Sequence, residues 1–214
     1  MELDHLSFAC GHEGLAETSD RLGRSLGAEF VDGGFHPRFG TRNRILPLAD
    51  GTYLEVVEVL DHPAADKVPF GQAVRARSEA GGGWLGWAVR VDDLAPIEKR
   101  LGRAAVPGSR HVPNGDELTW QQIGIKGLQS DPQLPFFIKW SSDMALHPSN
   151  SGPTDPKIKL LGLEIAGDPD RVDDWLGGHA DAVLTDFEIK WVAPNGQPGI
   201  LAATFATPEG EVRI

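Results

Sequence analysis

The chain of 214 residues repeats an order of strand-like and helix-like segments, and this repeat limits the folds that it can adopt. The first copy opens with an apolar run over 3–10 and continues with a helical pattern over 14–26 that ends at Gly27. Three strand-like runs follow, and the Asp50-Gly51 pair between two of them predicts a hairpin turn. The predicted order is therefore one strand, one helix and three strands.

A second copy begins after the glycine run at 81–83. It contains one strand, a short helix and two later strands, predicted at 84–91, 94–101, 118–125 and 136–141. The phrase Arg-Leu-Gly-Arg occurs near the end of both helical patterns, at 21–24 and at 100–103. Self-similarity over such a long period indicates a duplicated unit.

A third, shorter unit follows a segment at 147–156 whose Pro, Ser, Asn and Gly content is typical of a linker. Its strand, helix and later strands are predicted at 159–166, 169–176, 187–193, 200–205 and 211–214. The turn residues at 194–196 predict a hairpin. We expect an α+β fold of two paired βαβββ modules at 1–62 and 82–143, with a βαββ unit at 158–214 packed into the same domain.

The composition excludes several classes of partner. The formal net charge is −11, from 20 basic and 31 acidic residues, which argues against nucleic acid or an anionic membrane as a partner. No run of about 18 apolar residues is present, so no membrane span is predicted, and the acidic start at 1–4 argues against a secretory signal. The single cysteine, Cys10, fits a reducing cytoplasm. We therefore expect a cytoplasmic location.

Two polar residues stand out in the first copy. His5 lies in its first strand-like run and Glu55 in its last. At the corresponding places of the second copy the residues are Gly86 and Lys139. A site built from both copies would thus keep its polar pair in one half and have lost it in the other.

This pattern resembles the vicinal oxygen chelate superfamily, which includes glyoxalase I, extradiol dioxygenases, methylmalonyl-CoA epimerase and bleomycin-resistance proteins. More narrowly, it is similar to the glyoxalase-like domain branch, and the segments that carry the similarity are 3–6, 35–43, 46–55 and 134–140. The resemblance implies two modules that enclose a cavity, with metal ligands on the first and last strand of each. It assigns His5 and Glu55 to the first pair, whereas Gly86 and Lys139 depart from the family pattern.

That departure disfavours a divalent metal as cofactor, although one remains possible. His5 and Glu55 are one ligand short of the usual three, and His36 or His147 could complete the set. An ammonium group beside a metal is repelled by roughly 4 kcal/mol per unit charge at 4 Å. We therefore expect Lys139 to replace the metal. Structural roles also remain open, because a core histidine, a buried ion pair of Glu55 or a lysine that reaches solvent would fit as well.

Strand alternation predicts which neighbours share the cavity with these residues. Tyr53 shares a face with Glu55, Phe137 shares one with Lys139, and Trp84 shares one with Gly86. Two residues of the loop region between strands, His36 and Asn43, could also contact a ligand, or could simply order their loop. The predicted ligand-binding residues are His36, Asn43, Tyr53, Trp84 and Phe137.

The sequence leaves three functions open. The first is an enzyme that abstracts a proton next to a carbonyl of a small carbonyl- or carboxylate-bearing metabolite, as a lyase or isomerase, with Glu55 as base and His5 or Lys139 stabilising the oxyanion. The second is a protein that binds a small drug or metabolite without chemistry. The third is a metal-dependent enzyme, including a dioxygenase. In each case the partner is a small molecule, and the third unit could also make a homodimer contact.

Overall fold

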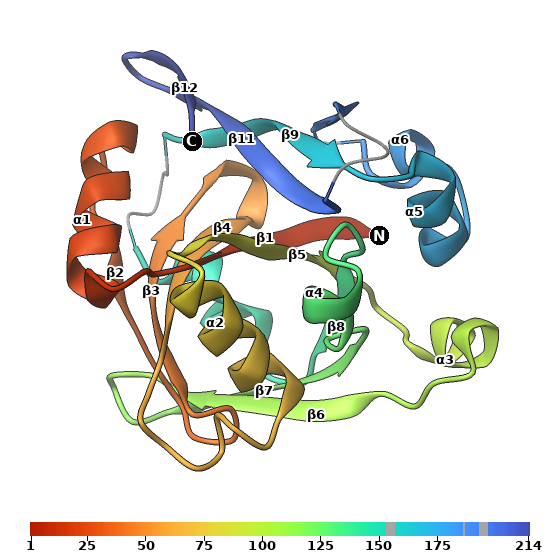
Figure 1. Cartoon of the computed structure of the whole chain (residues 1–214), viewed down its shortest axis with the longest axis horizontal. Coiled ribbons are helices and arrows are strands. Elements are labelled where there is room, and N and C mark those ends of the chain that lie inside the picture. Colours follow the sequence, from red (N-terminus) through yellow and green to blue (C-terminus); the bar gives the residue numbers. More distant parts are fainter. Residues whose placement is uncertain (153–156, 186, 193–196) are drawn as a thin grey trace.

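The strands of the two predicted modules close into one barrel in the computed structural model, which describes residues 1–152, 157–185, 187–192 and 197–214 (Figure 1). The strand order around the barrel is β1 (Glu2–Ala9), β4 (Tyr53–Val59), β3 (Thr41–Pro47), β2 (Val31–His36), β6 (Val106–His111), β7 (Glu117–Ile123), β8 (Phe136–Trp140) and β5 (Gly83–Arg90). Strand β5 pairs with β1 and closes the circle. Side chains that alternate inward along these strands fill the interior.

The barrel has two halves with the same strand pairing. In the first half β1 and β4 are parallel, with Ser7 beside Glu55. In the second half β5 and β8 are parallel, with Ala88 beside Phe136. The halves join along the antiparallel pair β1–β5 and at a short contact between β2 and β6. This arrangement confirms the predicted α+β fold of paired βαβββ modules.

Three helices end at a Leu-Gly step, namely α1 (Gly14–Leu26), α3 (Ala95–Leu101) and α5 (Pro169–Leu176). The glycines that follow lie at equal spacing, at 27, 102 and 177, with left-handed φ angles of 69°, 61° and 82°. Glycine adopts this conformation without a Cβ clash, so each one ends its helix. The Arg-Leu-Gly-Arg phrase is a poorer guide to the repeat, because its first copy at 21–24 lies inside α1.

Helix α2 (Pro69–Glu79) connects the two halves and was not predicted. It packs against β4 and β5 (Figure 1). Its buried residues Phe70, Ala73 and Val74 belong to one apolar cluster with residues of the barrel strands. Glycine and alanine occupy several of its buried positions, so the helix carries little of the hydrophobic periodicity that sequence analysis detects.

A four-stranded sheet lies across the β1–β5 side of the barrel (Figure 1). Its order is β10 (Glu188–Trp191), β9 (Lys159–Ala166), β11 (Gly199–Thr207) and β12 (Gly210–Arg213). The predicted turn at 194–196 lies outside the described residues, and the strands on either side of it each pair with β9. Trp175 of α5 joins this unit to the barrel, because its indole N–H donates to the Pro135 carbonyl at 2.7 Å. The division at 1–62, 82–143 and 158–214 stays a prediction.

Short helical turns complete the described elements, namely α4 (Gly127–Ser130), α6 (Ala180–Val183) and 3-10 turns at Ala49–Gly51, Met144–Leu146 and Pro148–Asn150. Two of the 3-10 turns lie near or within the segment predicted as a linker, and His147 there is 2% exposed. Residues 153–156 of that segment lie outside the described part. No helix among the described residues is long and apolar enough to cross a membrane.

Candidate functional site

A small cavity inside the barrel contains most of the predicted site residues. The free volume of this cavity is about 30 Å³. The side chains around it are His5, His36, Phe39, Asn43, Tyr53, Glu55, Phe70, Arg110, Trp120, Gln122, Ile125, Phe136, Ile138 and Trp140. The polar residues come mainly from the first half of the barrel and the apolar residues mainly from the second.

Strands β1 and β4 bring the predicted pair together. Their parallel register places His5 beside Tyr53, and the two rings stack with centroids 4.6 Å apart. His5 Nε2 lies 3.8 Å from Glu55 Oε1. Both side chains are almost fully buried. The structure therefore places His5, Tyr53 and Glu55 around one cavity, and their roles stay predictions.

The carboxylate of Glu55 is held by two neutral donors. Ser7 Oγ donates to Oε1 at 2.5 Å, and Asn43 Nδ2 donates to Oε2 at 2.7 Å. Burial alone would raise the pKa of Glu55, but the nearby histidines and these two hydrogen bonds hold that pKa below its ordinary value. Glu55 is therefore an ionised and weakly basic carboxylate at neutral pH.

A second buried carboxylate, Asp4, orients His5 from the other side. Its Oδ1 lies 2.6 Å from His5 Nδ1, and its Oδ2 accepts from Trp140 Nε1 at 2.9 Å. His147 Nε2 lies 3.1 Å from the same Oδ2. Burial would raise the pKa of Asp4, but the hydrogen bonds from His147 and His5 and their charges lower it well below its ordinary range. An ionised Asp4 can only accept hydrogen bonds, so the Nδ1 proton of His5 points at Asp4 and Nε2 faces the cavity.

The tautomer of His147 agrees with this assignment. The backbone N–H of Ser149 donates to His147 Nδ1 at 3.3 Å, so that nitrogen accepts and Nε2 carries the proton that is donated to Asp4. Residues 147 and 149 belong to the segment that follows the second module. This segment therefore supports His5 through Asp4.

His36 and Asn43 also line the cavity, as predicted. His36 Nδ1 lies 3.1 Å from Thr41 Oγ1, and burial lowers the pKa of His36 to about 4. His36 is therefore neutral at pH 7. Asn43 uses its amide group to hold Glu55, while its Oδ1 is buried and has no partner among the described residues.

The structure places three predicted residues outside the cavity. In β8 the inward positions belong to Phe136, Ile138 and Trp140, so the expectation that Phe137 and Lys139 face the cavity is wrong by one position of strand alternation. Phe137 instead stacks on Trp175, with ring centroids 5.9 Å apart, and Lys139 is partly exposed.

Trp84 also lies outside the cavity, because the alternation of β5 is interrupted. The pairing register of β5 with β1 shifts between Ser7 and Phe8. This bulge places Trp84 and Gly86 on opposite faces of β5, although strand alternation predicted the same face. Trp84 packs on Phe8, and its indole N–H donates to the carbonyl of Ile214 at 3.3 Å.

The pairing register identifies different counterparts in the second half. Ala88 and Phe136 pair as His5 and Tyr53 do in the first half. Two positions further along β8, Ile138 corresponds to Glu55. These counterparts of the polar pair are apolar, so the second half has lost both groups.

The residues present do not fit the metal centre that the family pattern implies. No three His, Cys, Asp or Glu side chains within the described ranges form a group that could hold a metal ion. Both oxygens of Glu55 already accept hydrogen bonds, and the buried guanidinium of Arg110 lines the same cavity. A cation in that position disfavours a second cation.

Sequence reasoning missed Asp4 and Arg110. Strand alternation places Asp4 on the opposite face from His5, so its carboxylate was not assigned to the site. Arg110 belongs to β6, which was not predicted as a strand. Gly108 lies two residues before Arg110 in the same strand. A glycine is required there, because a Cβ would lie 2.3 Å from the ring of Trp120. The glycine lets that indole fill the space next to Arg110.

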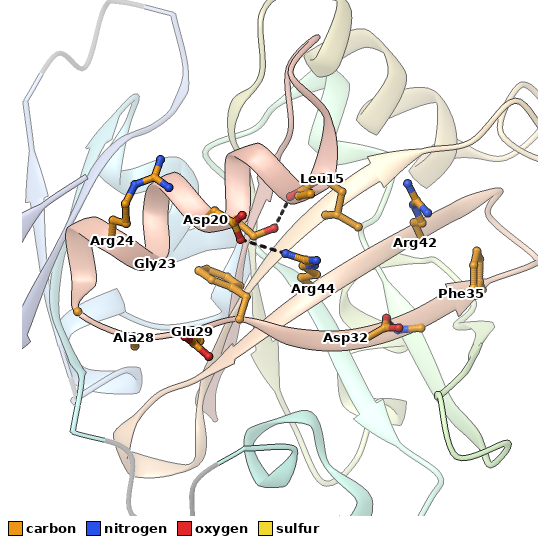
Figure 2. A pocket seen from close by; sticks show the side chains of 15 residues that line it. Leu15, Asp20, Gly23, Arg24, Ala28, Glu29, Asp32, Phe35, Arg42 and Arg44 are labelled. Carbon is orange, nitrogen blue, oxygen red and sulfur yellow. Dashed lines mark hydrogen bonds and ion pairs between the residues drawn. The ribbon is translucent and has the colours of Figure 1, made fainter.

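A wider groove on the surface is a weaker candidate. It lies between α1 and strands β2 and β3 and has a volume of about 890 Å³ (Figure 2). Its charged side chains neutralise one another, as in the ion pair of Arg44 with Asp20 at 3.2 Å. Arg42 likewise lies 2.6 Å from Glu58. These exposed pairs leave no buried group in the groove that requires a ligand.

The closed barrel of paired βαβββ modules defines a protein of the vicinal oxygen chelate superfamily. The sequence model of the glyoxalase-like domain family matches residues 3–180, and the chain belongs to this family. No curated protein gives a significant match.

The chain is similar to several solved structures. A hypothetical protein from Staphylococcus aureus matches with a TM-score of 0.61 and 13% identity, over 99% of this chain and 84% of that chain. Methylmalonyl-CoA epimerase from Mycobacterium tuberculosis matches with a TM-score of 0.41 and 16% identity, over 64% of this chain and 85% of its own. The hypothetical protein BH1468 from Bacillus halodurans C-125 matches with a TM-score of 0.42 and 14% identity, over 66% and 94%. The first of these likenesses establishes the fold over nearly the whole chain.

Proposed function

We propose that this protein is an enzyme that moves a proton at the carbon next to a carbonyl group of a small metabolite, as a lyase or isomerase does. The observation that carries this proposal is the arrangement of His5 between two ionised carboxylates. His5 Nδ1 donates its proton to Asp4 Oδ1, and the two atoms are 2.6 Å apart. On the cavity side, Glu55 Oε1 lies 3.8 Å from His5 Nε2. A histidine held in this way is suited to accept and return a proton.

The proton transfer uses the free nitrogen of His5. Nε2 accepts the proton from the substrate carbon, and the electron pair of that C–H bond moves into the carbonyl group to form an enolate. The imidazolium that forms lies between Asp4 and Glu55. The Nδ1–H of that ring keeps its hydrogen bond to Asp4 Oδ1 at 2.6 Å, and Glu55 Oε1 lies 3.8 Å from Nε2. Return of the proton at another position completes an isomerisation, and loss of a leaving group completes an elimination. General base catalysis of this kind contributes about 10²–10⁴-fold to the rate.

This assignment differs from the sequence hypothesis, which gave the role of base to Glu55. Glu55 keeps both oxygens in hydrogen bonds with Ser7 and Asn43, and its lowered pKa makes it a poor proton acceptor. We therefore assign the proton to His5 and the stabilisation of its charge to Glu55. Lys139 is partly exposed and takes no part.

Exchange of hydrogen for deuterium tests the proposal. A set of small 2-oxo and 2-substituted carboxylic acids, incubated with the protein in D₂O, should contain at least one compound whose α-hydrogen exchanges, as followed by NMR. His5→Gln should reduce that exchange at least about 100-fold, and Lys139→Ala should leave it unchanged. If His5→Gln exchanges as fast as the original protein, His5 is not the base.

A binding protein without chemistry is the second candidate. The observation that favours it is the apolar second half, where Ala88, Phe136 and Ile138 stand in place of polar groups. A ligand retained by the protein without product, in the same deuterium experiment, would support this candidate over the enzyme. The homodimer and the cytoplasmic location stay predictions.

A further inference from the structure

Arg110 is a buried cation for which the described residues supply no ionic partner. Its side chain lines the barrel cavity, and the residue is 2% exposed. Within the described part of the chain its guanidinium makes no ion pair within 4.0 Å, and its Nε is buried without an acceptor. Burial lowers the pKa of Arg110, while Tyr53, Glu55 and Asp32 act in the opposite direction.

An unpaired guanidinium in a protein interior is unusual, because removing it from water is costly unless an anion compensates. Glu55 would be the natural partner within the same cavity. Its two oxygens are instead held by Ser7 and Asn43, and no ion pair joins it to Arg110. The positive charge of Arg110 is therefore left for a molecule that enters the cavity.

We propose that Arg110 binds the carboxylate of the substrate, so that the substrate is a small carboxylic acid whose reacting carbon faces His5. This inference rests on the proposed function for the reaction but not for the binding. A guanidinium offers two parallel N–H donors that match the two oxygens of a carboxylate. The free volume of the cavity is about 30 Å³, so a carboxylate, which has fewer atoms than a phosphate, displaces the surrounding side chains less.

The rest of the substrate has a place outside the cavity. A second, largely apolar groove of about 720 Å³ shares the side chains of Phe39, Phe70, Gln122 and Ile125 with the cavity wall. In the proposal, a molecule whose carboxylate lies on Arg110 extends between these shared side chains, and its apolar end occupies the groove. The substrate class is therefore an acid with an apolar substituent beyond the reacting carbon.

Calorimetric titration with hexanoate tests the anchor, and hexanamide serves as the matched uncharged probe. The complete protein should bind hexanoate more tightly than hexanamide. Arg110→Met should weaken hexanoate at least about 100-fold and leave hexanamide unchanged. Arg24→Met, at an exposed arginine that pairs with Glu17 at 3.7 Å, is the control and should bind both probes as before. Equal binding of hexanoate by the original protein and Arg110→Met would overturn the proposal.

Thermal unfolding of the ligand-free variant gives an independent readout. Because the substitution removes an unpaired buried charge, Arg110→Met should have a melting temperature at least as high as that of the original protein. A lower melting temperature would mean that Arg110 stabilises the fold. Butyrate should bind more weakly than hexanoate if the groove takes the apolar end, and equal binding would remove the groove from the proposal.

The two proposals fail separately. His5→Gln should bind hexanoate as the original protein does, although it loses deuterium exchange. If the original protein exchanges the α-hydrogen of some carbonyl compound but binds no carboxylate, the inference about Arg110 is wrong and the proposed reaction stands. If hexanoate binds through Arg110 and no acid exchanges its α-hydrogen, the reaction is wrong and the anchor stands.

Discussion

The carboxylate of Asp4 should be one of the main single contributors to the stability of the site, and Asp4→Asn measures its contribution. Asp4 accepts from three donors, on His5, His147 and Trp140, at 2.6, 3.1 and 2.9 Å. Asparagine keeps the shape but loses the charge, and it presents an N–H₂ group to a site that supplies donors. Each hydrogen bond to a charged group weakens by roughly 1 kcal/mol when the charge is removed. The expected loss in the free energy of unfolding is therefore about 3 kcal/mol.

Urea unfolding at pH 7, followed by tryptophan fluorescence, measures this loss directly. For a chain of this length a loss of about 3 kcal/mol lowers the melting temperature by roughly 6–12 °C. Asp20→Asn is the matched control, because that carboxylate is exposed and pairs with Arg44 at 3.2 Å. The control should cost less than about 1 kcal/mol. If Asp4→Asn lies within about 0.5 kcal/mol of the original protein, the network around His5 does not stabilise the fold and the argument fails.

The difference in the free energy of unfolding between the original protein and Asp4→Asn should depend on pH in one direction. The folded-state pKa of Asp4 is depressed, so its stabilisation is fully present above the pKa of the unfolded chain, near 3.9. As the pH falls below that value, Asp4 protonates first in the unfolded chain and the stabilisation decreases. The difference between the original protein and Asp4→Asn should thus be constant from pH 7 to pH 5 and shrink below about pH 4.

Three further changes test other parts of the argument. The folded pKa of His36 is lowered to about 4, so the unfolded chain binds an extra proton below about pH 6.5 and stability should fall by up to about 3 kcal/mol between pH 6.5 and pH 4; His36→Gln should flatten this slope in urea unfolding at a series of pH values. Gly86→Ala should cost about 1–3 kcal/mol in the same assay, because its Cβ would lie 2.3 Å from Leu128 Cδ2, and a cost near zero would mean that Leu128 moves freely. Lys139→Ala should change the free energy of unfolding by less than about 0.5 kcal/mol, and a larger loss would give Lys139 a structural role that its partial exposure does not indicate.

The first half of the barrel could be predicted from the sequence because its signals are local. The helical pattern over 14–26 has strong apolar spacing and a glycine cap, and α1 has the bounds that this pattern predicts. Alternation along β1 and β4 then fixes which side chains face inward, so His5 and Glu55 were placed correctly in the cavity. Each of these inferences needs only the residues of one element.

The second half required information that local patterns do not contain. Which residues of β8 face inward depends on where its pairing with β5 begins. The predicted register was wrong by one residue, so Lys139 was assigned to the cavity position that Ile138 occupies. The bulge in β5 is likewise a property of its pairing with β1. Arg110 could not be assigned to the cavity from the sequence, because β6 is short, rich in polar residues and lacks apolar alternation.

The charges in the cavity explain why one half of a duplicated barrel could become apolar while the site remained. Glu55 and Arg110 line the same cavity with opposite charges, while the charge of Asp4 is held by His5, His147 and Trp140. In the proposal, a carboxylate bound to Arg110 pairs with that guanidinium and leaves Nε2 of His5 facing the reacting carbon. When His5 takes the proton from the substrate carbon, the electron pair of the C–H bond moves into the carbonyl group, so the positive imidazolium and the negative enolate form together and the net charge of the cavity does not change. This division of roles requires one polar half, which supplies the base, and one arginine from the other half, which holds the acid.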